Sequence, residues 1–238
     1  MSQAFPLGRW RERDSMSQRK AGSGFAAMAY EPTEPMSYYE VLDIFSEGDG
    51  LVEGTLVDGI AFGSEDANGT DFKRCVFRNC LFESTHLVDS TFHDVRFEGC
   101  RFINSAMDKT WLNRVDFADC SAPGLSLVQA RLAGVSMRGC GLSYANLSAA
   151  SVERPRLTGT RLREAALQRA RLKHVVLKGC DLTHLDVFGT RLAGIDLSSC
   201  VFQAPVLSSN LHELRGALIS PEQEIDLAAL LGVEVVKG

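Results

Sequence analysis

Residues 71–102 read DFKRCVFRNCLFESTHLVDSTFHDVRFEGCRF, and this stretch decides the fold. Every fifth residue in it is large and apolar, namely Phe72, Phe77, Phe82, Leu87, Phe92, Phe97 and Phe102. The phase continues without a slipped residue to Leu207, with Ala122 as the one small member. A period of five matches neither the 3.6-residue period of an α-helix nor the two-residue period of a flat strand. Each five-residue unit is therefore predicted to be one short extended side followed by a corner.

A second inward position lies two residues before each large one and is mostly small. All seven cysteines occupy it, and six of them are separated by multiples of twenty: Cys80, Cys100, Cys120, Cys140, Cys180 and Cys200. Twenty residues correspond to four sides per turn, with turns stacked about 4.8 Å apart. We interpret the cysteines as small buried hydrophobic residues in a stack, because a reducing compartment argues against disulfides.

Several units resemble the A(D/N)LXX signature of the pentapeptide-repeat family: Tyr144-Ala145-Asn146-Leu147-Ser148, Asp181-Leu182-Thr183 and Gly194-Ile195-Asp196-Leu197-Ser198. The resemblance implies an all-β, right-handed quadrilateral parallel β-helix, a solenoid that is often a dimer joined through its C-terminal end. It also implies, as the best understood mode of action, an acidic rod that mimics DNA, binds a type II topoisomerase such as DNA gyrase and protects it from quinolones.

The chain is predicted to divide into four segments. Residues 1–35 carry five basic side chains and a Gly/Ser/Ala-rich stretch without repeats, and we expect them to be a disordered extension. The sequence leaves two alternatives open: these residues could be a nucleic-acid-binding tail, or they could lie upstream of a true translation start at Met36. Residues 36–51 are predicted to be a cap or lead-in, 52–210 the β-helix, and 211–238 a C-terminal cap.

The C-terminal cap is predicted to contain a short α-helix followed by a strand. Ser220 and Pro221 are typical of a helix start, Gln223 completes a capping box, and Gly232 ends the helix. Residues 233–236 alternate like a strand. The same apolar residues could cover the last turn or form a two-fold dimer interface; the candidates are Ile219, Leu227, Leu230, Leu231, Val233 and Val235.

The sequence contains no candidate for chemistry: no catalytic residue, metal ligand or cofactor site is predicted. The five histidines have no metal-ligand spacing, and there is no phosphate-binding loop or nucleophile elbow. A filled β-helix is also expected to leave no internal cavity. We therefore predict a protein that is not an enzyme. Without an apolar stretch of 18 residues or a secretion signal, a cytoplasmic location is expected, with no membrane partner.

Charge is distributed unevenly along the repeat. Residues 41–108 carry thirteen acids against five bases, which favours a DNA mimic, whereas residues 131–178 carry ten bases against two acids, which contradicts it. The candidate partner surface comprises Arg131, Arg161, Arg163, Arg171, Arg191 and Phe188.

Three functions remain in order of preference. The first is a structural or protein-interaction module of unknown partner, and the second is a DNA-mimicking modulator of DNA gyrase that confers quinolone or toxin tolerance. Direct binding of nucleic acid or another anionic polymer is the weakest. Outward charge that serves only solubility is the simplest alternative to all three.

Overall fold

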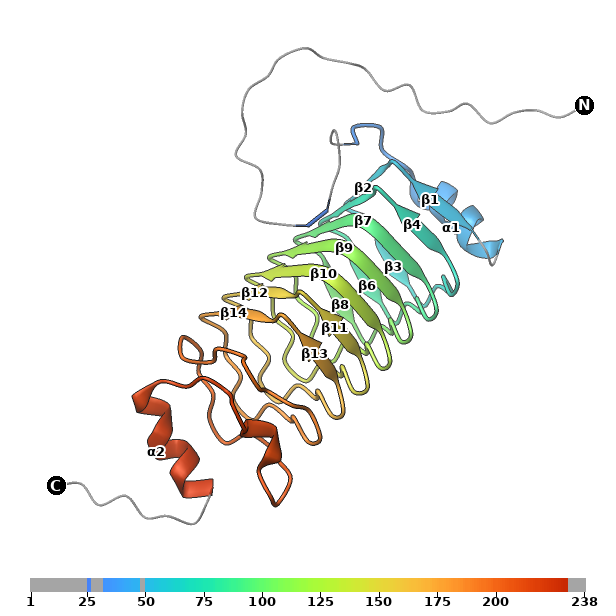
Figure 1. The fold of residues 1–238 in the computed structure, drawn as a ribbon. Helices are drawn as coiled ribbons and strands as arrows, with labels where there is room; N and C mark the ends of the chain where they lie inside the picture. Colours follow the sequence, from blue (N-terminus) through green and yellow to red (C-terminus); the bar gives the residue numbers. More distant parts are fainter. Residues whose placement is uncertain (1–24, 27–31, 48–49, 231–238) are drawn as a thin grey trace, which may run out of the picture.

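The computed structural model describes residues 25–26, 32–47 and 50–230, which form a rod of stacked turns with a helix at each end (Figure 1). The elements are α1 (Tyr38–Ser46), β1 (Leu51–Glu53), β2 (Leu56–Asp58), β3 (Ala61–Gly63), β4 (Asp71–Lys73), β5 (Val76–Arg78), β6 (Leu81–Glu83), β7 (Thr91–Glu98), β8 (Arg101–Ile103), β9 (Trp111–Ala118), β10 (Arg131–Arg138), β11 (Ser151–Glu153), β12 (Arg156–Thr158), β13 (Arg171–Lys173), β14 (Val176–Lys178), the 3-10 turn η1 (His212–Leu214) and α2 (Pro221–Leu230).

The strands pair in parallel at a register of twenty residues, which confirms the predicted four-sided β-helix. Phe72 lies beside Phe92, Phe77 beside Phe97 and Phe82 beside Phe102. We call the side that carries β1, β4 and β13 the first face and the side that carries β2, β5 and β14 the second face. The third face carries β3, β6 and β8, and the fourth is held by isolated bridges such as Asp66–His86. Strands β7, β9 and β10 each cross the corner between the first two faces.

The interior changes in character along the rod. In the N-terminal half, phenylalanine rings stack from turn to turn at centroid separations near 5 Å, as in Phe72–Phe92 at 4.6 Å and Phe82–Phe102 at 4.8 Å. These rings are almost fully buried. Offset stacking of this kind adds to the free energy gained by burying the rings. The C-terminal half carries leucine, valine and methionine at the same inward positions.

The expected absence of an internal cavity is wrong. The C-terminal half encloses an apolar cavity of about 70 Å³, lined among others by Leu142, Leu157, Leu162, Leu177 and Leu182. Backbone pairing fixes the cross-section of the rod, and leucine is smaller than phenylalanine, so the same cross-section is filled less completely here. The cavity has only apolar walls and therefore offers no polar group for chemistry.

The N-terminal end is closed by α1. Ser37 and Glu40 form a reciprocal capping box, and Val41 and Phe45 are buried, with Phe45 packed against Phe62 at 5.8 Å between ring centroids. Residues 1–24 and 27–31 of the expected disordered extension lie outside the described residues. The described remainder has defined contacts, whereas the sequence predicted disorder: Pro35 pairs with Leu56, and residues 25–26 lie against the rod.

At the C-terminal end the register lengthens, because Asp196 pairs with Leu218, 22 residues away. The predicted helix then follows as α2, and Gln223 joins it to the last turn. Its side-chain oxygen accepts from the Ser220 N–H at 2.8 Å, as a capping box requires. Its amide nitrogen donates to the carbonyls of Leu197 at 3.0 Å and Cys200 at 2.7 Å. The Leu197 carbonyl also accepts from the Cys200 N–H at 2.9 Å, whereas Gln223 supplies the Cys200 carbonyl with a partner at the end of the ladder. The described part of α2 ends at Leu230, so the predicted end at Gly232 and the strand 233–236 lie outside the described residues.

A pair of substitutions tests how the two halves are packed. We expect Phe97→Leu to lower the free energy of unfolding by about 1–2 kcal/mol, because it interrupts the stack between Phe77 and Phe117. We expect Met137→Phe to raise the free energy of unfolding by about 0.5–1.5 kcal/mol, because a ring there would stack on Phe117 in the preceding turn and fill part of the cavity. The midpoint of urea unfolding, followed by circular dichroism, measures both. A destabilised Met137→Phe protein would mean that the interior space cannot accept a ring.

Candidate functional site

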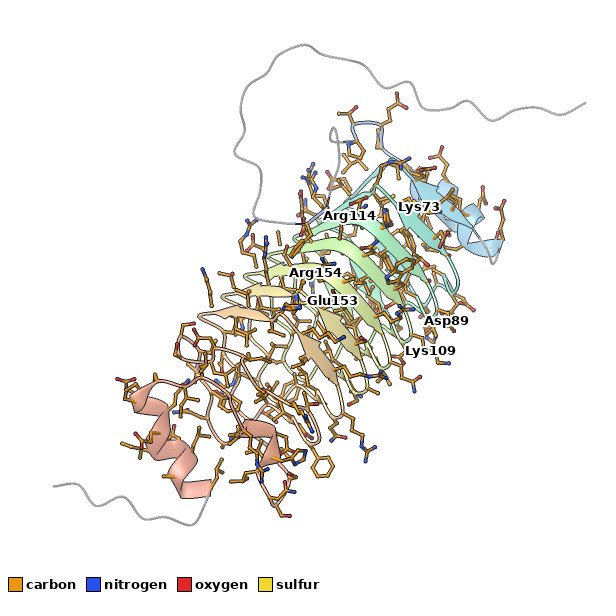
Figure 2. The ribbon with its side chains drawn as sticks, in the orientation of Figure 1. Lys73, Asp89, Lys109, Arg114, Glu153 and Arg154 are labelled. Carbon is orange, nitrogen blue, oxygen red and sulfur yellow. The ribbon has the colours of Figure 1, made fainter. Side chains whose placement is uncertain are left out.

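The base-rich stretch forms a belt around the middle of the rod, which we call the basic belt: Arg131, Arg138, Arg154, Arg156, Arg161, Arg163, Arg169, Arg171, Lys173 and Lys178. All ten side chains are exposed. Two of them form ion pairs with described residues: Arg163 contacts Asp181 at 3.3 Å, and Arg154 contacts Glu153 at 3.7 Å. Figure 2 shows Glu153 and Arg154 side by side on this part of the rod. The belt therefore keeps most of its positive charge available to another molecule.

The acid-rich turns nearer the N-terminus differ, because most of their bases are already paired. Arg78 contacts Glu98 at 3.0 Å, Lys73 contacts Asp71 at 3.2 Å, and Arg74 pairs with Glu53. Exposed acids such as Glu83 and Asp89 remain. The surface of this half is accordingly acidic, and the rod has two regions of opposite charge.

The six residues predicted as a partner surface lie on three faces. Arg131 and Arg171 lie on the first face, where both are in register with Ser151, and Arg191 follows one turn later. Arg161 and Arg163 lie on the third face, and Phe188, 42% exposed, lies on the fourth. The structure therefore brings the three first-face arginines into one column but does not bring all six residues together.

A polar cluster at the corner of the first face was not anticipated from the sequence. The Arg114 guanidinium donates to both carboxylate oxygens of Asp94, at 2.7 and 2.5 Å, and Asp94 is nearly buried. The His93 ring nitrogens lie 2.6 Å from Arg114 Nη2 and 3.0 Å from Asn113 Nδ2. Both ring nitrogens thus face polar groups of this cluster, and Nε2 also lies 3.1 Å from Asp94 Oδ2. The arrangement is that of a structural ion pair.

The cysteines lie where the repeat places them, as buried free thiols. In five of them the sulfur contacts a carbonyl of the preceding turn: Cys75, Cys80, Cys100, Cys120 and Cys140. Burial raises the pKa of the Cys75 thiol to about 12. The Cys75 thiol is therefore protonated at neutral pH and is a poor nucleophile. No cluster of three or more potential metal ligands occurs among the described residues, and no helix of the described chain is long and apolar enough to cross a membrane.

A groove of about 460 Å³ runs along the second face over β7, β9, β10, β12 and β14. Its floor contains the small side chains Ala118, Ser136 and Thr158. Arg138, Arg156 and Lys178 line it toward the C-terminal end, while Glu98 and Asp116 line it toward the N-terminal end. Sequence reasoning missed this groove. The sequence feature that could have indicated the groove is the series of small outward residues in successive turns of the second face, where the repeat otherwise carries charged side chains.

The chain's own residues 25–26 lie at this groove. The N–H groups of Phe25 and Ala26 donate to the two oxygens of Asp116, at 2.7 and 3.0 Å. The Phe25 ring lies 4.3 Å from the Arg156 guanidinium carbon, an arrangement that allows a cation–π contact. Its edge approaches Gly134 so closely that a side chain at 134 would meet it at 3.3 Å. Gly134 leaves a gap in the corner column that also holds Arg114 and Arg154 (Figure 2), and Phe25 fills this gap.

Apolar side chains are exposed at the C-terminal end: Leu218, Ile219, Ile225 and Leu230. Leu227, a predicted interface residue, instead packs partly buried against the core and so belongs to the cap. Leu231, Val233 and Val235 lie outside the described residues.

The chain is similar, at low identity, to several solved structures of pentapeptide-repeat proteins. One is HetL, "a Pentapeptide Repeat Protein involved in Heterocyst Differentiation Regulation" from the cyanobacterium Nostoc sp. strain PCC 7120, with 20% identity over 77% of this chain and 92% of that chain and a TM-score of 0.45. A second is a trypsin-treated variant of QnrB1, a plasmid-mediated fluoroquinolone resistance protein, with 19% identity over 79% of this chain and 91% of that chain and a TM-score of 0.39. A third is Rfr23, a pentapeptide repeat protein from the cyanobacterium Cyanothece 51142, with 19% identity over 54% of this chain and 84% of that chain and a TM-score of 0.22. At these identities and TM-scores the likeness carries no functional argument.

No curated protein matches the chain in sequence. Family models do match: the pentapeptide repeat region at residues 70–147 and 90–167, and pentapeptide repeats (8 copies) at residues 156–194. Together they cover residues 70–194 of the 238, more than half of the chain. These residues are the ones whose twenty-residue register builds the rod, and the chain belongs to the pentapeptide-repeat family.

Proposed function

We propose that this protein is a non-enzymatic interaction module that presents a charged face of a rigid rod to a partner protein. The observation that carries the proposal is the exposed and largely unpaired basic belt, set beside turns of opposite charge. Complementary charge of this kind speeds association and selects among partners. On the first face, Arg131 and Arg171 of the belt form a column that Arg191 continues, and a flat acidic surface could dock on this column.

Capture of partners from a lysate of the source cells tests this function. We expect the immobilised protein to retain a defined partner at low salt and to lose it as salt screens the belt. Arg131→Glu combined with Arg171→Glu should reduce the capture at least tenfold. Lys109→Glu combined with Arg215→Glu, two exposed cations outside the belt, is the matched control and should leave it unchanged. The partner is then identified by mass spectrometry and tested as a purified protein. Equal losses with both double variants would contradict a role for the belt.

A DNA-mimicking modulator of DNA gyrase is the second candidate. It is favoured by the acid surplus of residues 41–108, thirteen acids against five bases, together with the pairing of most of those bases. An acidic rod of this kind would compete with DNA for a basic saddle. The basic belt opposes this candidate, because it interrupts the acidic surface in the middle of the rod.

A supercoiling assay with purified DNA gyrase, with and without a fluoroquinolone and at several salt concentrations, distinguishes the two candidates. A mimic should inhibit the enzyme or protect it from the drug at or below micromolar protein. Glu83→Gln combined with Asp89→Asn should then weaken the effect, whereas Glu222→Gln combined with Glu224→Gln at the far end of the rod should not. The absence of any effect across that range would exclude the gyrase role.

The exposed apolar residues of the C-terminal end support a homodimer joined through this end. Light scattering coupled to size exclusion should give twice the mass of one chain. Ile225→Glu should convert the protein to a monomer, because Ile225 is 55% exposed on α2 and a charge there would be buried in the interface. Val201→Glu, a change at a similarly exposed position on the third face, is the control. A wild-type protein with the mass of one chain would contradict the dimer.

A further inference from the structure

The groove on the second face carries unused positive charge. Its acids are satisfied: Asp116 accepts from the N–H groups of Phe25 and Ala26 and from the Ser136 hydroxyl, and Glu98 pairs with Arg78. Three of its bases have no acidic partner among the described residues. Arg138, Arg156 and Lys178 are exposed, and no ion pair with a described residue is recorded for any of them. The C-terminal end of the groove therefore presents three cations around a floor that contains Thr158 and Val176.

The three cations have a fixed arrangement, because the ladder sets it. Arg138 and Lys178 lie two turns apart in one outward column, with Thr158 between them, and Arg156 lies two residues before Thr158 on the same strand. Two turns correspond to about 10 Å, the rise of roughly three residues of an extended chain. An extended peptide that runs along the rod could thus place acidic side chains at both Arg138 and Lys178.

The groove already accepts a polypeptide. Residues 25–26 contact it through two backbone N–H groups and one aromatic ring, and Ala26 forms part of its wall. Backbone hydrogen bonding and a pocket for one side chain are the elements of extended-peptide recognition elsewhere. Nucleic acid fits less well, because a phosphate backbone following this face toward the N-terminus would meet Glu98, Asp116 and Asp119.

We propose that the second-face groove binds an extended acidic segment of a partner protein, and that residues 25–26 compete with that segment for one end of the groove. The partner segment would place carboxylates at Arg138, Arg156 and Lys178 and an aromatic side chain over Gly134. This assignment rests on the proposed function as an interaction module. It specifies the kind of segment that the partner would present, which is extended, acidic and aromatic at one position.

Fluorescence anisotropy with a defined probe tests the proposal on the full-length protein. The probe is a fluorescein-labelled peptide of about twelve residues that contains one Phe followed by four Glu, and a second peptide carries Gln in place of each Glu. We expect the acidic peptide to bind at least tenfold more tightly than the Gln peptide. An oligonucleotide with the same number of negative charges should bind more weakly than the acidic peptide, and tighter binding of the oligonucleotide would overturn the proposal.

Three variants locate the site. Arg138→Glu combined with Lys178→Glu should weaken binding of the acidic peptide at least tenfold, whereas Lys109→Glu combined with Arg215→Glu, the same charge change outside the groove, should change it less than threefold. Phe25→Ala should tighten binding about three- to tenfold, because it releases the chain's own competing segment. Equal weakening of peptide binding by both double variants would overturn the proposal. Unchanged or weaker peptide binding by the Phe25→Ala protein would overturn it as well.

Circular dichroism and urea unfolding establish that each variant is folded, which is expected because the charged positions are exposed. The peptide assay is independent of the lysate experiment. A protein that captures a partner through Arg131 and Arg171 but does not bind the peptide would refute the groove and leave the proposed function intact.

Discussion

The in-register parallel ladder, with each residue paired to the one twenty positions later, is the constraint on which the rest of this structure depends. Backbone N–H groups of one turn donate to carbonyls of the next along all four faces. Residues at the same place in successive turns therefore lie about 4.8 Å apart and must tolerate one another. The phenylalanine stacks, the column of cysteines and the columns of outward charge all follow from this one pairing rule, and so does the cavity, since the ladder does not contract where the inward residues become smaller.

A ladder of this kind also determines where the rod must be closed. The first and last turns have backbone groups without a neighbouring turn, and each end is covered by a helix. At one end α1 buries Val41 and Phe45 against the first turns, and at the other Gln223 donates to two carbonyls of the last one. The two ends differ in what they expose, because α2 leaves the aliphatic side chains of Ile225 and Leu230 in solvent, whereas α1 exposes Tyr39. That asymmetry is why self-association is proposed at the C-terminal end.

Function in such a rod depends on the outward positions, because the inward ones are set by packing and offer buried thiols and apolar walls. Charge is separated along the axis, with an acidic N-terminal half and a basic belt. Of the acids near the groove, Glu98 is ion-paired with Arg78, and Asp116 is hydrogen-bonded to the backbone of residues 25–26. The groove lies where the small side chains Ala118, Ser136 and Thr158 replace longer outward ones. A few small residues in a charged repeat are thus enough to create a concave site.

The sequence by itself determined the four-sided coil, the inward and outward positions, the buried cysteines and the capping helix, because a strict five-residue period has few physical solutions. It did not determine the groove, since Phe25 and Asp116 are 91 positions apart and no local pattern links them. The cavity likewise depends on the cross-section that backbone pairing imposes, which the volumes of single residues do not reveal. The twenty-residue period by itself placed Arg131, Arg171 and Arg191 on one face of the rod. Only the tertiary structure decided which outward side chains contact one another, because contacts such as Arg163–Asp181 run between turns and depend on how the side chains are placed.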